Sequence, residues 1–298
     1  MRQTTAYRTD LIALVVSIVS IAASAPIIVA FSGPALAIAL WRNVIGTAAT
    51  LPLALRHRAA LVEMPKRHWY FTIGAGVLLG VHFATWIPSL RYTSIAASTA
   101  LVATQVVWAA LIAYGTGHRA PRAEWVGIGV ALVGTFVLTG IDISLEPRAL
   151  FGDLLSLAGA IAAAAYVALG QRVRTTLPLS AYTTVVYAIA SLTLLIVCLL
   201  TGTQLWGFSA TDWWLIIAIT VFAQFGGHTL MNMALRSFSA TAVSLAILVE
   251  VPGATLLGWV WPGQTPPWQL LPGAALVLTG LVIVLRASRD ETVADSVT

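Results

Sequence analysis

Polar and aromatic side chains recur at helical spacing inside long apolar segments of this sequence. His82 and Trp86 are four residues apart, as are His228 and Asn232, so each pair falls on one face of a helix. Polar side chains at membrane depth are costly, and they normally face a cavity or another helix. Aromatic walls with a few polar anchors suit a flat, amphipathic organic solute. A metal ion would need a cluster of acids, and a phosphate ester a cluster of Lys and Arg, and neither stands at membrane depth.

Further candidates lie on other apolar segments. Gln105 corresponds to Glu250 in the second half of the chain, Trp108 follows Gln105 by nearly one turn, and Tyr166 lies in an Ala-rich run. The residues expected to contact a substrate are therefore His82, Trp86, Gln105, Trp108, Tyr166, His228, Asn232 and Glu250.

Each of these residues also has a structural interpretation. The two histidines could hydrogen-bond across helices, and the two tryptophans could fill the core of a bundle. Glu250 could be a hydrogen-bonded structural group, or it could bind a substrate amine or a proton. Arg42 lies about two turns into an apolar segment, where it could attract a carboxylate, extend to the membrane surface or pair with Asp153.

The elements that carry these residues are membrane-spanning helices. Apolar residues make up 59% of the chain and charged residues 9%, whereas a soluble domain has about a quarter charged residues. In lipid only helices or closed barrels satisfy the backbone, and the apolar runs are too long for barrel strands. An all-α integral membrane protein is expected, with ten segments at roughly 10–31, 35–55, 69–90, 94–116, 124–141, 151–171, 180–201, 212–234, 240–261 and 268–286.

The sequence repeats itself once. Arg91 and Arg236 stand in similar stretches 145 residues apart, and Asp10 and Asp153 are 143 residues apart. Two copies with an odd number of spans each must lie upside down relative to one another. Inverted repeats of this kind are typical of transporters, with the substrate site near the midplane between the halves. The halves are residues 1–148 and 149–298.

The positive charges orient the expected bundle. With the N-terminus in the cytoplasm, thirteen of the 16 Lys and Arg residues fall in inner loops, two (Arg91 and Arg148) in outer loops, and Arg42 within a span. This bias predicts that both termini are cytoplasmic. No basic run suits nucleic acid, and the single cysteine, Cys198, excludes a disulfide framework and a cysteine metal site.

Several segments resemble the EamA-type drug/metabolite transporters. The similarity lies in Trp41-Arg42-Asn43 on the second span, in 92–109 and 241–258 for the fourth and ninth spans, and in 127–140 and 273–285 for the fifth and tenth. The family often has Gly-Glu after the fourth and ninth spans, where this chain has Gly117-His118 and Gly263-Gln264.

The resemblance implies two inverted five-helix repeats around a central cavity formed largely by spans 1, 3, 4, 6, 8 and 9. Length and aromatic pattern are most similar to the YddG-type exporters of aromatic amino acids. We therefore expect a bacterial inner-membrane protein that exports aromatic or other apolar amino acids and related metabolites by alternating access, without a cofactor or metal, as a monomer.

Two other functions stay open at this point. Glu250 with Trp108 could hold an organic cation, as in a multidrug exporter on the same fold. An intramembrane enzyme is the remote alternative, because the sequence contains no metal-binding His pair with an adjacent acid and no Gly-flanked serine nucleophile. A non-enzymatic protein is expected.

Overall fold

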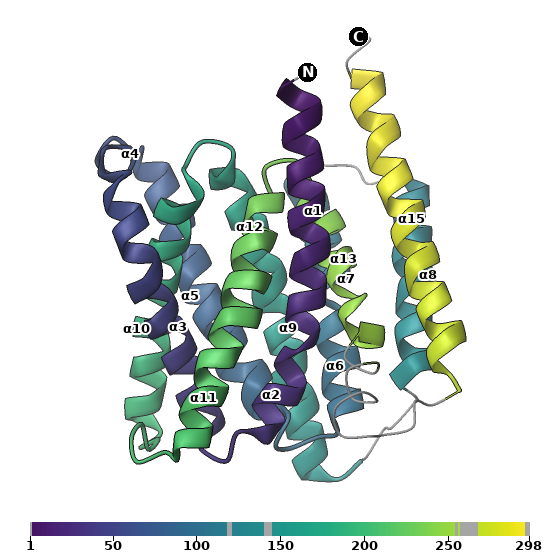
Figure 1. The fold of residues 1–298 in the computed structure, drawn as a ribbon. Helices are drawn as coiled ribbons and strands as arrows, with labels where there is room; N and C mark the ends of the chain where they lie inside the picture. The colour runs from purple at the N-terminus through teal and green to yellow at the C-terminus, as the bar shows by residue number, and fades with distance from the viewer. Residues whose placement is uncertain (1, 118–120, 140–144, 254–255, 257–267, 296–298) are drawn as a thin grey trace.

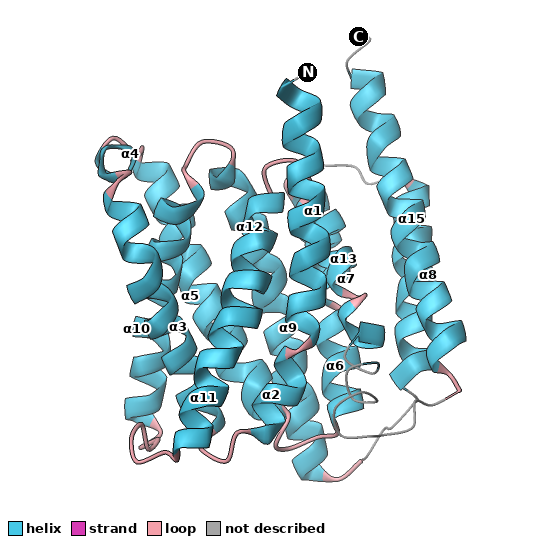
Figure 2. Ribbon diagram, viewed as in Figure 1, coloured by secondary structure: helices cyan, strands magenta, loops and turns pink. Residues whose placement is uncertain are grey.

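The fold is known from a computed structural model, which describes residues 2–117, 121–139, 145–253, 256 and 268–295. These residues form helices joined by loops, with no strand among them (Figure 2). Seven helical segments in the described part of the chain are long and apolar enough to cross a membrane, and 240–253 and 270–284 are shorter apolar helices. The expectation of an all-helical membrane protein is confirmed.

The described helices follow the expected segments. The first half contains α1 (Arg2–Ala22), α2 (Ser24–Ala30), α3 (Ala35–Leu55), α4 (Arg58–Val62), α5 (Lys66–Ser89), α6 (Ile95–Ala103), α7 (Gln105–Gly115) and α8 (Arg122–Thr139). The second half contains α9 (Pro147–Arg174), α10 (Leu179–Leu200), α11 (Ala210–Ile219), the π-helix η1 (Thr220–Thr229), α12 (Leu230–Ala234), α13 (Ala240–Ile247) and α15 (Leu270–Asp295).

Some boundaries differ from the expected ones. The first helix starts at Arg2 and the last one continues to Asp295, well past the apolar runs that begin near residue 10 and end near 286. Hydropathy marks the part of a helix that suits lipid, whereas helix-forming Ala, Arg and Glu continue the helix beyond it. The end of the expected ninth span, 254–261 apart from Leu256, lies outside the described residues, as do His118, Gly140, Gly263 and Gln264.

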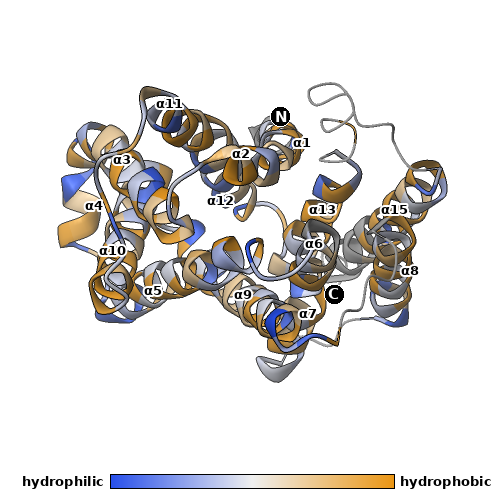
Figure 3. Ribbon diagram, turned by 90° about the horizontal axis from the view of Figure 1, so that it is seen from below, coloured by the Kyte–Doolittle hydropathy of each residue, from blue (hydrophilic) through white to orange (hydrophobic). Residues whose placement is uncertain are grey.

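The long helices run side by side, and the start of α1, the loop with α4 and the end of α15 lie at one end of the bundle (Figure 1). α5 packs against α9, α3 against α10, and α1 against η1 and α12. Seen along the bundle in Figure 3, α8 and α15 form a separate pair at one edge. Glycines bring this pair together, since a Cβ on Gly134 would lie 2.7 Å from the carbonyl oxygen of Gly273.

Polar contacts fasten both ends of the bundle. At the end with the termini, Arg236 after α12 donates two hydrogen bonds to Asp10 on α1, at 2.9 and 3.2 Å. At the opposite end, the Asp212 carboxylate accepts from the Ser32 amide at 2.9 Å, and Arg91 Nη2 donates to the Phe31 carbonyl at 2.6 Å. These bonds connect α1 to the turn after α12 at one end of the bundle, and the segment after α2 to α11 and to the turn after α5 at the other end.

Candidate substrate cavity

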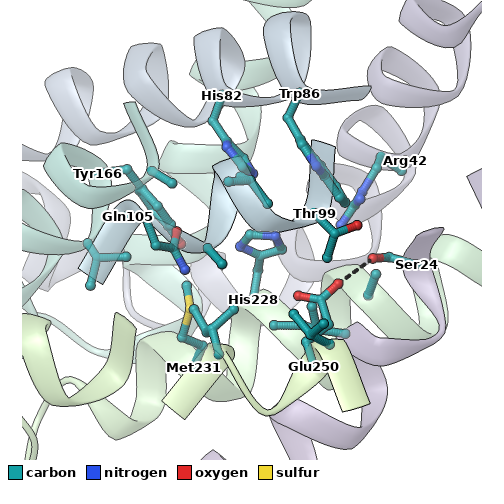
Figure 4. A pocket seen from close by; sticks show the side chains of 18 residues that line it. Ser24, Arg42, His82, Trp86, Thr99, Gln105, Tyr166, His228, Met231 and Glu250 are labelled. Atoms are coloured by element: carbon teal, nitrogen blue, oxygen red, sulfur yellow. Dashed lines mark hydrogen bonds between the residues drawn. The ribbon is translucent and has the colours of Figure 1, made fainter. Parts of the chain in front are cut away.

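A cavity of about 50 Å³ lies between helices of the two halves. It has room for several water molecules, at about 10–15 Å³ each, and is smaller than the about 300 Å³ at which organic ligand sites begin. Side chains enter it from α3 and α5 of the first half and from α9 and η1 of the second (Figure 4). Six of the eight predicted contact residues line it: His82, Trp86, Gln105, Tyr166, His228 and Glu250.

The rings on α5 are held by α9. The Nδ1 of His82 donates to the carbonyl of Gly159 at 2.9 Å, since a carbonyl can only accept. Gly159 permits this approach, because a Cβ there would lie 3.0 Å from the Cβ of Trp86. The His82 and Trp86 rings stack 5.6 Å apart at an angle of 7°. The four-residue spacing on α5 therefore places two parallel, stacked aromatic rings at the cavity.

The π-helix η1 sets the direction of His228. Thr229 Oγ1 donates to the Gln224 carbonyl at 3.0 Å, five residues back along the chain. In an α-helix Gln224 and His228 would share a face, but the wider π turn separates them. His228 lines the cavity, 6.1 Å from the ring of Tyr166, whereas Gln224 points toward α3.

Asn232 does not line the cavity. It is fully buried behind Tyr166, and its Nδ2 donates to the Tyr166 hydroxyl and to the His228 carbonyl, the latter at 2.7 Å. Asn232 therefore contacts the backbone of His228 and supports the Tyr166 ring from behind.

Trp108 also lies away from the cavity. Thr104 separates α6 from α7. Gln105 at the start of α7 lines the cavity, whereas Trp108, further along the same helix, does not. Trp108 is partly exposed, and its indole Nε1 is buried without a hydrogen-bond partner. The organic-cation hypothesis paired Trp108 with Glu250, but of these two residues only Glu250 lines the cavity.

Arg42 is the residue whose place the sequence left open. It is 1% exposed and lines the cavity, so it does not extend to the membrane surface, and it forms no ion pair with Asp153 although both residues are described. Its Nε donates to Gln224 Oε1 at 2.8 Å, and its Cζ stands 4.4 Å from the centre of the Phe83 ring. The guanidinium is fixed against one wall of the cavity.

The network behind Arg42 begins on its own helix. Gln224 Nε2 donates to Asn43 Oδ1 at 3.0 Å, and Asn43 Nδ2 donates to the Ala39 carbonyl one turn back. These bonds fix which end of the Gln224 amide faces Arg42. The adjacent residues Arg42 and Asn43 are therefore joined through one glutamine of the other half.

The cavity also contains residues that the sequence reasoning did not select as contacts. Ser24 on α2 donates to Glu250 Oε1 at 3.3 Å, and in the sequence it is one of three serines on the first span, with Ser17 and Ser20. Thr99 was visible as a polar residue inside an apolar segment six positions before Gln105. Met231 and the aliphatic residues that complete the lining carry no distinguishing sequence signal, because apolar residues also cover every lipid-facing surface.

The comparisons with known proteins agree with this architecture. A family model described as the EamA-like transporter family matches residues 9–140 and again 150–286. The search of curated proteins finds no match. A solved structure titled "Crystal structure of protein" is 19% identical, with a TM-score of 0.76, and the alignment covers 97% of this chain and 99% of that one, a likeness of fold. The chain belongs to the EamA-like transporter family, and this membership points to a membrane transporter of small molecules.

Proposed function

We propose that this protein is a bacterial inner-membrane secondary transporter that exports aromatic or other apolar amino acids and related small metabolites by alternating access. The observation that carries the proposal is the cavity itself. It combines the stacked rings of His82 and Trp86 with polar groups such as Arg42 and Glu250. In a state in which the cavity is wider than these about 50 Å³, an apolar side chain can pack on the rings while the polar groups bind the amino-acid head.

The packing of the helices supports two inverted repeats, here residues 1–148 and 149–298. Under such a repeat, α8 is the counterpart of α15 and α3 that of α10, and each of these pairs is in contact. The contact of α5 with α9 has its counterpart in the contact of α1 with η1 and α12. These contacts between the halves thus occur in symmetric pairs, which is what rocking of one half against the other requires.

The two ends of the bundle support alternating access. Under the repeat, Asp153 and Arg91 are the counterparts of Asp10 and Arg236. The Asp10–Arg236 pair is formed, whereas Arg91 donates to the Phe31 carbonyl and Asp153 Oδ1 is buried without a partner. The end with the termini is thus fastened by an ion pair whose counterpart at the other end is not made. In the other state of the transporter we expect the reverse.

The orientation in the membrane follows from the charges. The two termini and the loop with α4 lie at the same end of the bundle, and Arg56 and Arg58 belong to that loop (Figure 1). The positive-inside bias supports the proposal that this end faces the cytoplasm.

Proteoliposomes test the proposal. Purified protein would be reconstituted and the uptake of labelled Phe, Trp, Leu and Ala measured against liposomes without protein. Saturable uptake of the aromatic or aliphatic amino acids supports the proposal. Absence of flux for every amino acid, with protein that is folded by circular dichroism, would refute it.

Export of organic cations is the second candidate, and the Glu250 carboxylate at the cavity is the observation that favours it. Arg42 at the same cavity opposes it, because a fixed cation repels another one. The Glu250→Gln variant separates the two functions: a cation exporter would lose most of its activity, whereas the flux of apolar amino acids would be reduced and retained in part.

A further inference from the structure

Three nitrogen atoms without partners belong to residues of the cavity. They are Arg42 Nη2, Trp86 Nε1 and His228 Nδ1, each buried and each without a hydrogen bond. Buried polar groups are nearly always hydrogen-bonded, and leaving one unsatisfied is costly. The concentration of three such atoms on residues of one cavity indicates a bound group that supplies hydrogen-bond partners, acceptors for Arg42 and Trp86 among them.

The guanidinium of Arg42 is the strongest donor of the three. Its Nε already donates to Gln224, and its Cζ lies 4.4 Å from the centre of the Phe83 ring, so its terminal nitrogens, Nη2 among them, are left for a ligand. A guanidinium stays charged in proteins, and a buried charge requires an opposite one. Arg–carboxylate pairs are among the strongest hydrogen bonds, since both partners are charged.

Glu250 provides a charge of the opposite sign at the same cavity. Its Oε1 accepts a long hydrogen bond from Ser24, at 3.3 Å, and its side chain is 8% exposed. Arg42 and Glu250 form no ion pair with each other, although both belong to the described part of the chain. Figure 4 shows their side chains entering the cavity from different helices. The two charges are therefore available to a ligand that carries both signs.

We propose that the cavity binds its substrate as a zwitterion, whose carboxylate accepts from Arg42 Nη2 and Trp86 Nε1 and whose ammonium donates to Glu250. The inference rests on the proposed function and deepens it, since it assigns the substrate's two charged groups to named residues. The substrate's apolar side chain then packs along the His82–Trp86 rings. Gln224 is a positioning residue: it holds the guanidinium by Nε and does not line the cavity.

The test compares three ligands on the wild-type protein. Counterflow of labelled Phe in proteoliposomes would be competed with unlabelled Phe, with phenylalanine amide, which lacks the carboxylate, and with 3-phenylpropanoate, which lacks the ammonium. Each missing charge removes a charge-assisted hydrogen bond, so we expect each analogue to compete at least about tenfold more weakly than Phe. An amide that competes as well as Phe would overturn the role of Arg42, and a phenylpropanoate that does so would overturn that of Glu250.

Variants then connect each charge to its residue. In Arg42→Met the preference for Phe over its amide should disappear, and in Arg42→Lys it should return in part. In Glu250→Gln the preference for Phe over phenylpropanoate should shrink while the preference over the amide stays. Arg56→Met, in an exposed loop, is the matched control and should keep both preferences. An Arg42→Met protein that still discriminates the amide would refute the assignment.

The same panel separates this inference from the proposed function. Flux of Phe with no loss for the amide would leave the transport of amino acids intact and refute the zwitterion site. If labelled 3-phenylpropanoate were transported and Phe were not, both the transport of amino acids and the contact of the ammonium with Glu250 would be refuted. Only the contact of a carboxylate with Arg42 would remain. If none of the three ligands bound or moved, both proposals would fall. The comparison of the three ligands uses the wild-type protein, so its outcome does not depend on whether a variant folds.

Discussion

Arg236 holds Asp10 with two hydrogen bonds, from Nε at 3.2 Å and from Nη2 at 2.9 Å, and so joins the turn after α12 to the first helix. The carboxylate is fully buried and also accepts from Ser237, while the arginine is 46% exposed. The positional equivalents of this pair, Arg91 and Asp153, form no such pair in the described structure. The two ends of the bundle thus differ in a contact that the sequence repeats.

Breaking this pair should favour opening of the end with the termini. Asp10→Asn keeps the size of the side chain and removes its charge, so the bidentate pair with Arg236 weakens. In a Cys198→Ser background, Ser24→Cys would report on access to the cavity through its reaction with a membrane-impermeant maleimide. We expect Asp10→Asn to speed labelling from the side of the termini several-fold.

A control for this experiment is Asp153→Asn at the opposite end. Because Asp153 Oδ1 has no partner, this change should leave the labelling rate from the terminal side nearly unaltered or lower it. Equal labelling rates in Asp10→Asn and the unmodified background would show that the pair does not hold this end closed.

Asn232 should act on the substrate through Tyr166. Because Asn232 Nδ2 donates to the Tyr166 hydroxyl, Asn232→Ala and Tyr166→Phe remove the same bond. We expect each to weaken the apparent affinity for Phe several-fold and the double variant to be no weaker than the poorer single one. The measurement is KM for uptake in a double-mutant cycle. Additive losses would mean that Asn232 acts by another route.

The α8–α15 interface should tolerate no side chain at its glycines. Gly134→Ala places a Cβ within 2.7 Å of two backbone atoms and one side chain of α15, so the helices must separate, at a cost of about 1–3 kcal/mol. Gly129→Ala, on the same helix with nothing within 4 Å, should be neutral or slightly stabilising. Thermal unfolding in one detergent compares the two, and equal unfolding temperatures would contradict this packing.

The sequence predicts the helices well because a lipid environment demands long apolar runs. Six of the eight predicted contact residues line one cavity. For His82 and Trp86, α-helical spacing explains why they lie on the same face of α5. The count of ten spans and the inversion of the repeats stay predictions, and part of the ninth span lies outside the described residues.

Two of the predicted contact residues do not line the cavity. Asn232 was grouped with His228 on regular α-helical geometry, yet His228 belongs to the wider π turn of η1, whereas Trp108 lies one turn beyond Gln105 on the regular helix α7. The π turn depends on packing against other helices: a Cβ on Gly227 of η1 would lie 2.4 Å from Ile21 of α1, a contact made only in the fold. Arg42 could not be placed because its partner, Gln224, is 182 residues away.

Counterflow of labelled Phe in a wild-type and a filled-cavity protein tests the central claim most directly. Ala163 lines the cavity from α9, so Ala163→Phe fills it, whereas Ile161→Phe adds bulk to the exposed side of the same helix. We predict saturable counterflow in wild type and Ile161→Phe, and a loss of at least about tenfold in folded Ala163→Phe. Absence of counterflow in wild type, or full counterflow in folded Ala163→Phe, would contradict transport of amino acids through this cavity.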